Sequence, residues 1–204
     1  MRPLEIRNFK IELRKKIKEE RRNLDPEVKK GMDRAIRENV RRLHQYKRCH
    51  TLLIYVSTAI EVDTREIIKN AIKDGKKVAV PRCIPETREM TFHYIKDISE
   101  LSPGTFGVLE PDEKSEQVVD FSGCLMIVPA LTFDIRGYRL GYGMGYYDRC
   151  MSKFEGPSAG ICYQNDVRYH MPNGRFDRPV DVLVTEKWIR SKKAEKQKAW
   201  ETRN

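Results

Sequence analysis

The sequence predicts an α/β fold in which a mostly parallel central sheet is covered by helices on both faces. A short, continuously apolar run at 51–57 is typical of a strand that is buried on both sides, 77–83 predicts a second strand of the parallel type, and 124–129 predicts another buried strand. Longer amphipathic segments separate these runs, so that strands and helices alternate along the chain. With 204 residues, of which 39% are hydrophobic, the chain is long enough to form one domain with a sizeable core.

Two helices are expected before the first strand. Residues 4–22 carry an imperfect apolar stripe among many charges and predict the first helix. Asp25 and Pro26 predict the start of the second, as N-cap and first helical residue, and we expect it to run to about Gln45. Its buried stripe is predicted to consist of Val28, Met32, Ile36, Val40 and Leu43.

The middle of the chain predicts a βαβ unit followed by further strands. The runs at 51–57 and 77–83 flank a helix over 64–74, which Asp63 would cap and Gly75 would end. Further strands are expected at 90–96, 124–129, 158–163 and 180–185.

Two charged residues follow the ends of the parallel strands. Glu61 and Arg82 are therefore expected at the same edge of the sheet, where ligands bind in open α/β folds. For Arg82 we favour an ion pair with a neighbouring acid over a role in phosphate binding.

Positive charge is concentrated at the two ends of the chain. The net charge is +10, to which residues 1–48 contribute +9 and residues 186–204 contribute +4, while residues 49–185 contribute −3. This excess indicates either a surface that attracts polyanions or, as we favour, solvated helices with basic outer faces. We expect one α/β domain over residues 1–186 and a basic helix or tail over residues 187–204.

The composition favours a cytoplasmic protein. No apolar run approaches the length that spans a membrane, and the first residues lack the apolar core of a signal peptide. The five cysteines are scattered, odd in number and without a C-x-x-C pair. This pattern predicts reduced thiols and no zinc site.

The stretch that says most about function is 139–149, RLGYGMGYYDR. Three glycines at alternate positions let the backbone adopt positive φ and let a ligand approach the amides closely. Such amides bind anions, especially before a helix, which we expect from about Met144 to Lys153. Arg139 and Arg149 add charge that suits phosphate, and Asp148 is an oxygen ligand of the kind that Mg²⁺ takes beside substrate phosphates.

The spacing of the glycines also has a plain structural interpretation. It matches neither G-x-x-x-x-G-K-[ST] nor G-x-G-x-x-G, because Tyr146 stands where the last glycine of the second motif belongs. On spacing alone, a strand-to-helix turn with tyrosines packed on the sheet explains the stretch equally well. The histidines show no metal-ligand spacing and no G-x-S-x-G elbow occurs, so zinc enzymes and serine hydrolases receive little support.

The longer string from Pro129 to Arg149, PALTFDIRGYRLGYGMGYYDR, resembles the signature of 5-formyltetrahydrofolate cyclo-ligases, also called 5,10-methenyltetrahydrofolate synthetases. The segment K-x-x-L-R at 10–14 is similar to the N-terminal nucleotide-binding element of that family. The segment E-x-[DE]-T at 61–64 resembles the one whose glutamate contacts the folate. The resemblance covers about residues 10–186 and implies a three-layer α/β sandwich of the NagB/RpiA/CoA-transferase-like type.

The family resemblance implies a reaction and its substrates. The reaction is the ATP- and Mg²⁺-dependent conversion of 5-formyltetrahydrofolate to 5,10-methenyltetrahydrofolate, with release of ADP and phosphate. Phosphorylation of the formyl oxygen would precede ring closure by N10, and such chemistry needs positioning and charge neutralisation more than a strong base. The implied partners are ATP and 5-formyltetrahydrofolate, with or without a polyglutamate tail; a monomer is expected, without membrane or nucleic acid.

The resemblance also implies roles for individual residues. The implied catalytic residues are Arg139 and Tyr142. The implied ATP-binding residues are Lys10, Arg14, Arg139, Leu140, Gly141, Tyr142, Gly143, Met144, Gly145, Tyr146 and Tyr147. The implied folate-binding residues are Val56, Glu61, Tyr142, Gly143, Met144, Gly145 and Tyr146. The implied Mg²⁺ ligands are Asp148 and, on the weaker match PVDVLVTE, Asp181.

Met144 departs from the pattern of the family. Family members often carry glycine or lysine at the corresponding position, and a lysine there would add a phosphate contact that this chain lacks.

Two other functions fit parts of the sequence. The basic ends suggest a nucleic-acid-associated or scaffolding protein on the same fold, with Trp188 and Trp200 as the candidates for base stacking. A kinase or ATPase that acts on another small acid would use the same glycine-rich loop. Strongly salt-dependent RNA binding without turnover would favour the first alternative, and ATP hydrolysis without folate would favour the second.

Overall fold

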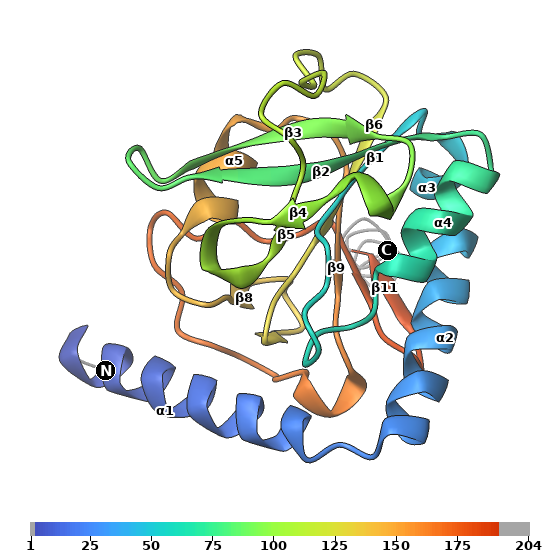
Figure 1. The fold of residues 1–204 in the computed structure, drawn as a ribbon. Coiled ribbons are helices and arrows are strands. Elements are labelled where there is room, and N and C mark those ends of the chain that lie inside the picture. The colour runs from blue at the N-terminus through green and yellow to red at the C-terminus, as the bar shows by residue number, and fades with distance from the viewer. Residues whose placement is uncertain (1–2, 192–204) are drawn as a thin grey trace, which may run out of the picture.

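The computed structural model describes residues 3–191 and consists of a central sheet with helices on both faces (Figure 1). In this part of the chain the main sheet has seven strands in the order β11-β10-β9-β6-β1-β2-β3. The parallel strands are β1 (Thr51–Ile54), β2 (Lys77–Ile84), β6 (Cys124–Val128), β9 (Ser158–Ile161) and β10 (Val182–Val184). The edge strands β3 (Glu89–Ile95) and β11 (Ile189–Ser191) are antiparallel to their neighbours. The predicted fold class is confirmed.

The helices occupy three positions around this sheet. One face is covered by α2 (Pro26–Arg42), α3 (His44–Arg48) and α4 (Arg65–Lys73). The other face is covered by α5 (Tyr146–Lys153). The long helix α1 (Pro3–Arg22) lies on neither face but runs past one end of the sheet (Figure 1).

Short elements complete the fold. The two small hairpins are β4 (Ser102–Pro103) with β5 (Leu109–Glu110), and β7 (Thr132–Phe133) with β8 (Arg139–Leu140). The 3₁₀ turns are η1 (Ile98–Glu100), η2 (Thr105–Gly107) and η3 (Gln164–Asp166).

The central strands contribute side chains to two cores, one on each face of the sheet. In β1, Leu52 and Ile54 pack with Ile36 of α2 on one face, whereas Leu53 packs on the other face in the cluster that includes Phe133. All of these side chains are fully buried. Because successive side chains of a strand point to opposite faces, a strand between two helix layers must be apolar throughout, which explains its continuous apolar run.

The start of the second helix is confirmed and its end is corrected. The Asp25 carboxylate accepts hydrogen bonds from the backbone N–H groups of Glu27 and Val28, at 2.8 and 3.1 Å. The helix does not continue to Gln45, because Leu43 leaves the helical conformation (φ −57°, ψ 133°) to bury its side chain, and the short α3 follows.

Val28 is wrongly predicted to be buried. It is 53% exposed, because the first turn of α2 extends beyond the strands (Figure 1). In contrast, Ile36, Val40 and Leu43 are buried as expected.

The segment after β10 is also corrected. Residues 189–191 form the edge strand β11, where the sequence predicts a helix from Lys187. The Thr185 hydroxyl accepts hydrogen bonds from the backbone N–H groups of Lys187 and Trp188, and this tight turn reverses the chain onto the sheet. The sheet therefore extends past residue 186. The rest of the predicted helix, with Trp200, lies outside the described residues.

Two expectations from composition can be compared with the structure. Within residues 3–191, no helix is both long and apolar enough to cross a membrane. The cysteine side chains form no disulfide bond and are free thiols.

A packing constraint in β9 gives a first prediction. Gly160 lies against the ring of Phe133, and a Cβ at this position would collide with the ring. Gly160→Ala should lower the free energy of unfolding by about 1–3 kcal/mol, because an added methyl group in a filled core forces neighbours off their rotamers. Urea unfolding followed by circular dichroism measures the change.

The control for this prediction is Gly31→Ala on the exposed side of α2. A Cβ on Gly31 meets no atom within 4 Å, so the gain in helix propensity should raise stability by about 0.5–1 kcal/mol. Similar destabilisation by both substitutions would contradict the packing explanation.

Candidate functional site

The candidate site lies between α1 and the carboxyl ends of the parallel strands. The loop that leaves β1 carries Glu61, and the chain that leaves β6 reaches the glycine-rich loop 141–145 through the β7–β8 hairpin. Helix α1 runs past this end of the sheet (Figure 1), and its side chains contact both segments.

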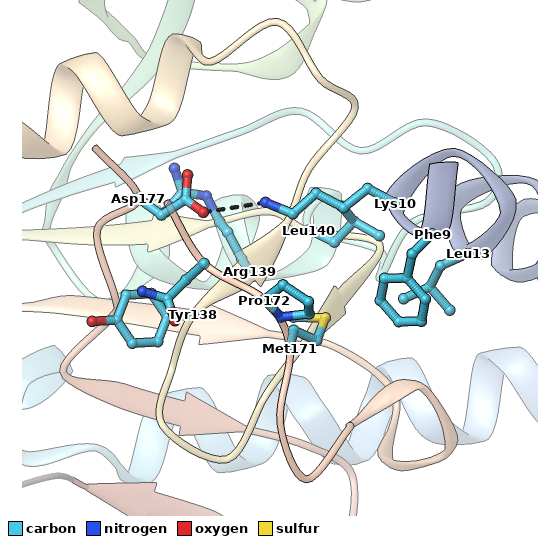
Figure 2. A pocket seen from close by; sticks show the side chains of 10 residues that line it. Phe9, Lys10, Leu13, Tyr138, Arg139, Leu140, Met171, Pro172 and Asp177 are labelled. Atoms are coloured by element: carbon cyan, nitrogen blue, oxygen red, sulfur yellow. Dashed lines mark hydrogen bonds and ion pairs between the residues drawn. The ribbon is translucent and has the colours of Figure 1, made fainter. Parts of the chain in front are cut away.

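One face of α1 presents four basic side chains to this site: Lys10, Arg14, Lys18 and Arg21. They recur at intervals of three or four residues, so they project from the same side of the helix. The K-x-x-L-R segment singles out Lys10 and Arg14, and the helical period extends the row to Lys18 and Arg21. The Lys10 ammonium pairs with the Asp177 carboxylate at 3.3 Å, beside a small hollow between α1 and the segment 171–177 (Figure 2).

Arg14 joins α1 to the glycine-rich loop. Its Nε donates a hydrogen bond to the Gly141 carbonyl at 2.9 Å. Gly143 and Gly145 have φ values of 104° and 73°, in the left-handed region that favours glycine. A Cβ on Gly143 would lie 3.5 Å from Nη2 of Arg14, so the guanidinium lies directly against the loop backbone. Partial burial lowers the pKa of Arg14.

Arg21 anchors the C-terminal end of α1. From its buried guanidinium, Nε donates to the Asp166 carboxylate at 2.8 Å, Nη1 to the Ile60 carbonyl at 3.3 Å, and Nη2 to the carbonyls of Leu131 at 2.8 Å and Ala130 at 3.3 Å. Burial opposes the positive charge, but the pairing with Asp166 outweighs it and raises the pKa of Arg21. This one side chain therefore connects α1 to the loops that follow β1 and β6.

Glu61 is buried beside Tyr142. Glu61 is only 5% exposed, and its Oε2 accepts hydrogen bonds from the backbone N–H and the hydroxyl of Thr58, both at 2.8 Å. Burial raises the pKa of the Tyr142 hydroxyl, and the negative charge of Glu61 raises it further. The structure thus brings together two predicted folate-binding residues, and it adds Thr58, for which the sequence shows no signal.

The loop that carries Glu61 is held from α2. The Asp33 carboxylate accepts hydrogen bonds from the Tyr163 hydroxyl at 2.7 Å and from the backbone N–H of Asp63 at 3.1 Å. It also pairs with the Lys29 ammonium at 2.7 Å. Burial raises the pKa of the Tyr163 hydroxyl, and the charge of Asp33 raises it further. These buried contacts limit the positions that Glu61 can adopt.

Arg139 and Asp148 are paired with each other. The Arg139 side chain is 4% exposed, and its Nη2 donates to Oδ1 of Asp148 at 2.7 Å. Its Nη1 donates to the Arg178 carbonyl at 2.8 Å, while the Arg178 N–H donates to the same Asp148 oxygen at 3.2 Å. Burial lowers the pKa of Arg139, against the opposing effect of Asp148. In this arrangement the Arg139 guanidinium faces Asp148 and not open space.

Asp181 lies at the opposite end of the sheet from Glu61. It directly precedes β10, and its Oδ2 accepts hydrogen bonds from the N–H and the hydroxyl of Ser158 at 2.9 and 2.8 Å, where β9 begins. Among residues 3–191, no group of three or more His, Cys, Asp or Glu side chains could hold a metal ion. Asp148 and Asp181 therefore do not fit a metal site built from protein ligands alone.

Comparisons with known proteins identify the family and the fold of the chain. A sequence profile of the 5-formyltetrahydrofolate cyclo-ligase family matches residues 6–186. The chain belongs to this family. The family predicted from the string at 129–149 is thus confirmed, and its members are named as ligases.

Individual relatives support the assignment. A Schizosaccharomyces pombe protein named probable 5-formyltetrahydrofolate cyclo-ligase is 32% identical over 174 residues, which cover 77% of this chain and 85% of the relative. The solved 5,10-methenyltetrahydrofolate synthetase of Aquifex aeolicus is 34% identical, with a TM-score of 0.79 over 89% of this chain and 92% of the other. A Mycoplasma pneumoniae synthetase, at 22% identity, has a TM-score of 0.70 over 87% and 98% of the two chains and supports the fold.

The remaining residues that the family resemblance singles out have different surroundings. Val56 and Leu140 are almost fully buried in the structure, at 2% and 3% exposure. Tyr146 is buried beneath the Arg149 guanidinium, which lies 5.7 Å from its ring centre. Met144 is 45% exposed, and the Arg149 side chain donates to its carbonyl at 2.7 Å.

Tyr147 packs with side chains of both cores, and no described residue pairs with its buried hydroxyl. Arg82 donates to the Pro111 carbonyl at 3.0 Å and pairs with Glu110 and Glu113, at 3.9 and 3.8 Å, as predicted from the sequence.

The buried ion pair gives a second prediction. Asp166→Ala should lower the free energy of unfolding by about 3–5 kcal/mol, because it leaves the buried Arg21 guanidinium without its counter-charge. Chemical unfolding with guanidinium chloride measures the change. The control is Glu38→Ala, which removes the partner of exposed Arg34 and should cost less than about 1 kcal/mol. If the two substitutions lowered the free energy of unfolding equally, burial would not explain the contribution of the Arg21–Asp166 pair to stability.

Proposed function

We propose that this protein converts 5-formyltetrahydrofolate to 5,10-methenyltetrahydrofolate, with ATP and Mg²⁺, and releases ADP and phosphate. Membership of the family supports this class of reaction. The observation that carries the proposal is the contact of Arg14 with Gly141, since it sets a basic helix face against a glycine-rich loop at the end of the sheet where Glu61 is buried.

The chemistry requires a nucleotide site and a folate site that meet. The formyl oxygen is a poor leaving group and N10 is a weak nucleophile. Transfer of the γ-phosphoryl group to the formyl oxygen forms an imidate-like phosphate; N10 then attacks the formyl carbon, the ring closes and phosphate leaves. Such a reaction depends mainly on positioning and on neutralisation of charge.

The phosphates of ATP would lie between α1 and the glycine-rich loop. Lys10 and Arg14 would supply positive charge from the helix, and backbone N–H groups of the loop and of the first turn of α5 would bind phosphate oxygens. Arg139 is paired with Asp148 beneath this loop, so in our proposal it supports the loop until a nucleotide competes for its guanidinium.

The folate would bind beside Glu61. A buried carboxylate accepts hydrogen bonds only, so it suits the N–H groups of a pterin ring. Tyr142 lies next to it, and the raised pKa of its hydroxyl keeps the proton in place as a donor for the substrate.

Mg²⁺ would enter as its complex with ATP. The described carboxylates do not form a metal site by themselves, and Mg²⁺ commonly binds through substrate phosphates, water and one or two carboxylates. Asp148 in the first turn of α5 is the carboxylate that we assign to this role; Asp181 is set aside because of its position.

The proposal is tested by mixing purified protein with 5-formyltetrahydrofolate, ATP and Mg²⁺. We expect an ATP-dependent rise in the near-ultraviolet absorbance of the methenyl product. A folded protein that binds ATP but forms no product would contradict the proposal. ADP release with another small acid would then favour a kinase, and salt-dependent RNA binding would favour a nucleic-acid-associated protein.

A substitution at Glu61 gives a third prediction. Glu61→Gln should raise KM for 5-formyltetrahydrofolate by about 10-fold to 100-fold, because it replaces a charge-assisted hydrogen bond to the pterin by a neutral one. KM for ATP should change by less than about 2-fold, since the phosphate contacts lie on α1 and the glycine-rich loop. Steady-state kinetics with each substrate varied in turn separate the two effects.

The matched control is Glu66→Gln on α4. Glu66 pairs with Lys69 on the exposed surface, and its loss should leave both KM values unchanged. An equal rise in both KM values for Glu61→Gln would indicate a general disturbance of the site and would contradict direct contact with the folate.

A further inference from the structure

We infer that Lys18 is a further phosphate ligand, which binds the terminal phosphoryl group of ATP where the nucleotide site meets the folate site. This inference rests on the proposed function. Lys18 lies outside the segment 10–14 that the family resemblance singles out.

The position of Lys18 on α1 is the first argument. It follows Arg14 by four residues, which places it on the same face of the helix and about 6 Å further along the axis. Arg14 contacts the Gly141 carbonyl in the glycine-rich loop, on the side that we propose for the nucleotide. Arg21 contacts the Ile60 carbonyl in the loop that carries Glu61, on the side that we propose for the folate. Lys18 therefore lies between the two sides.

The state of the neighbouring cations is the second argument. Three basic groups at the site are already paired with carboxylates: Lys10 with Asp177, Arg21 with Asp166, and Arg139 with Asp148. Lys18 forms no ion pair with any carboxylate in residues 3–191, so its charge is not neutralised there. A phosphoryl group in transfer carries negative charge on three equatorial oxygens and requires such an uncompensated cation.

The contact that Lys18 does make is the third argument. Its half-buried side chain places Nζ 5.0 Å from the centre of the Tyr142 ring, on the residue whose hydroxyl lies beside Glu61. A cation–π contact is weaker than a charge-assisted hydrogen bond to phosphate, so a phosphate oxygen can replace it. The exposed Met144 offers no ammonium group, whereas Lys18 supplies one from α1.

The test compares Lys18→Met with Lys16→Met. Each substitution removes one positive charge from α1, but Lys16 lies on the outer face, where it pairs with Glu20. Calorimetry with Mg²⁺ measures the affinity for ADP and for a non-hydrolysable ATP analogue. Lys18→Met should weaken binding of the analogue by about 10-fold or more and binding of ADP by less than about 3-fold, because only the analogue carries the terminal phosphate. Lys16→Met should change neither, and Lys18→Arg should restore most of the preference for the analogue.

Each other outcome decides against the inference. Equal weakening of ADP and the analogue would overturn the assignment to the terminal phosphate, and unchanged affinities would overturn phosphate binding by Lys18 altogether. If the unsubstituted protein binds neither nucleotide, the proposed function fails, and the inference fails with it. Thermal unfolding of each variant checks that the comparison is made on folded protein.

Discussion

The geometry of the candidate site depends on the buried ion pair of Arg21 and Asp166. Such a pair adds little net stability over well-packed apolar side chains, because removing both charges from water offsets their attraction. Its effect here is positional. The planar guanidinium reaches a carboxylate and three backbone carbonyls at once, and a rigid fork satisfies these acceptors in one orientation only. Helix α1 is thereby fixed relative to the loops after β1 and β6.

Because α1 is a regular helix, anchoring Arg21 also positions the side chains that precede it on the same face. With Arg21 anchored, Arg14 meets the glycine-rich loop, and Lys18 falls between that loop and the segment that holds Glu61. Asp33 of α2 fixes the same segment from the other side. The two halves of the site are thus held by rigid helices, as a reaction that depends on positioning requires.

Prediction from the sequence succeeds where the signal is local. The cap at Asp25 and the left-handed Gly75 (φ 76°) follow from backbone preferences of single residues, and the apolar strands follow from burial on both faces. It fails at Leu43, where a helix breaks to bury one side chain, and after Thr185, where a turn directs residues 189–191 onto the edge of the sheet. Both outcomes depend on partners that are distant in the sequence.

By itself, the sequence determined the order of the main strands and helices up to β10, the glycine-rich loop before α5 and the family, because each is carried by residues that are adjacent or separated by a helical or strand period. Only the tertiary structure decided that Arg139 faces Asp148, that Asp181 lies at the other end of the sheet, that Arg21 pairs with Asp166, and that Lys18 lies against the Tyr142 ring. The physical reason is that the pairing of charges depends on burial and on which distant segments are brought into contact. A single sequence contains no local signal for either.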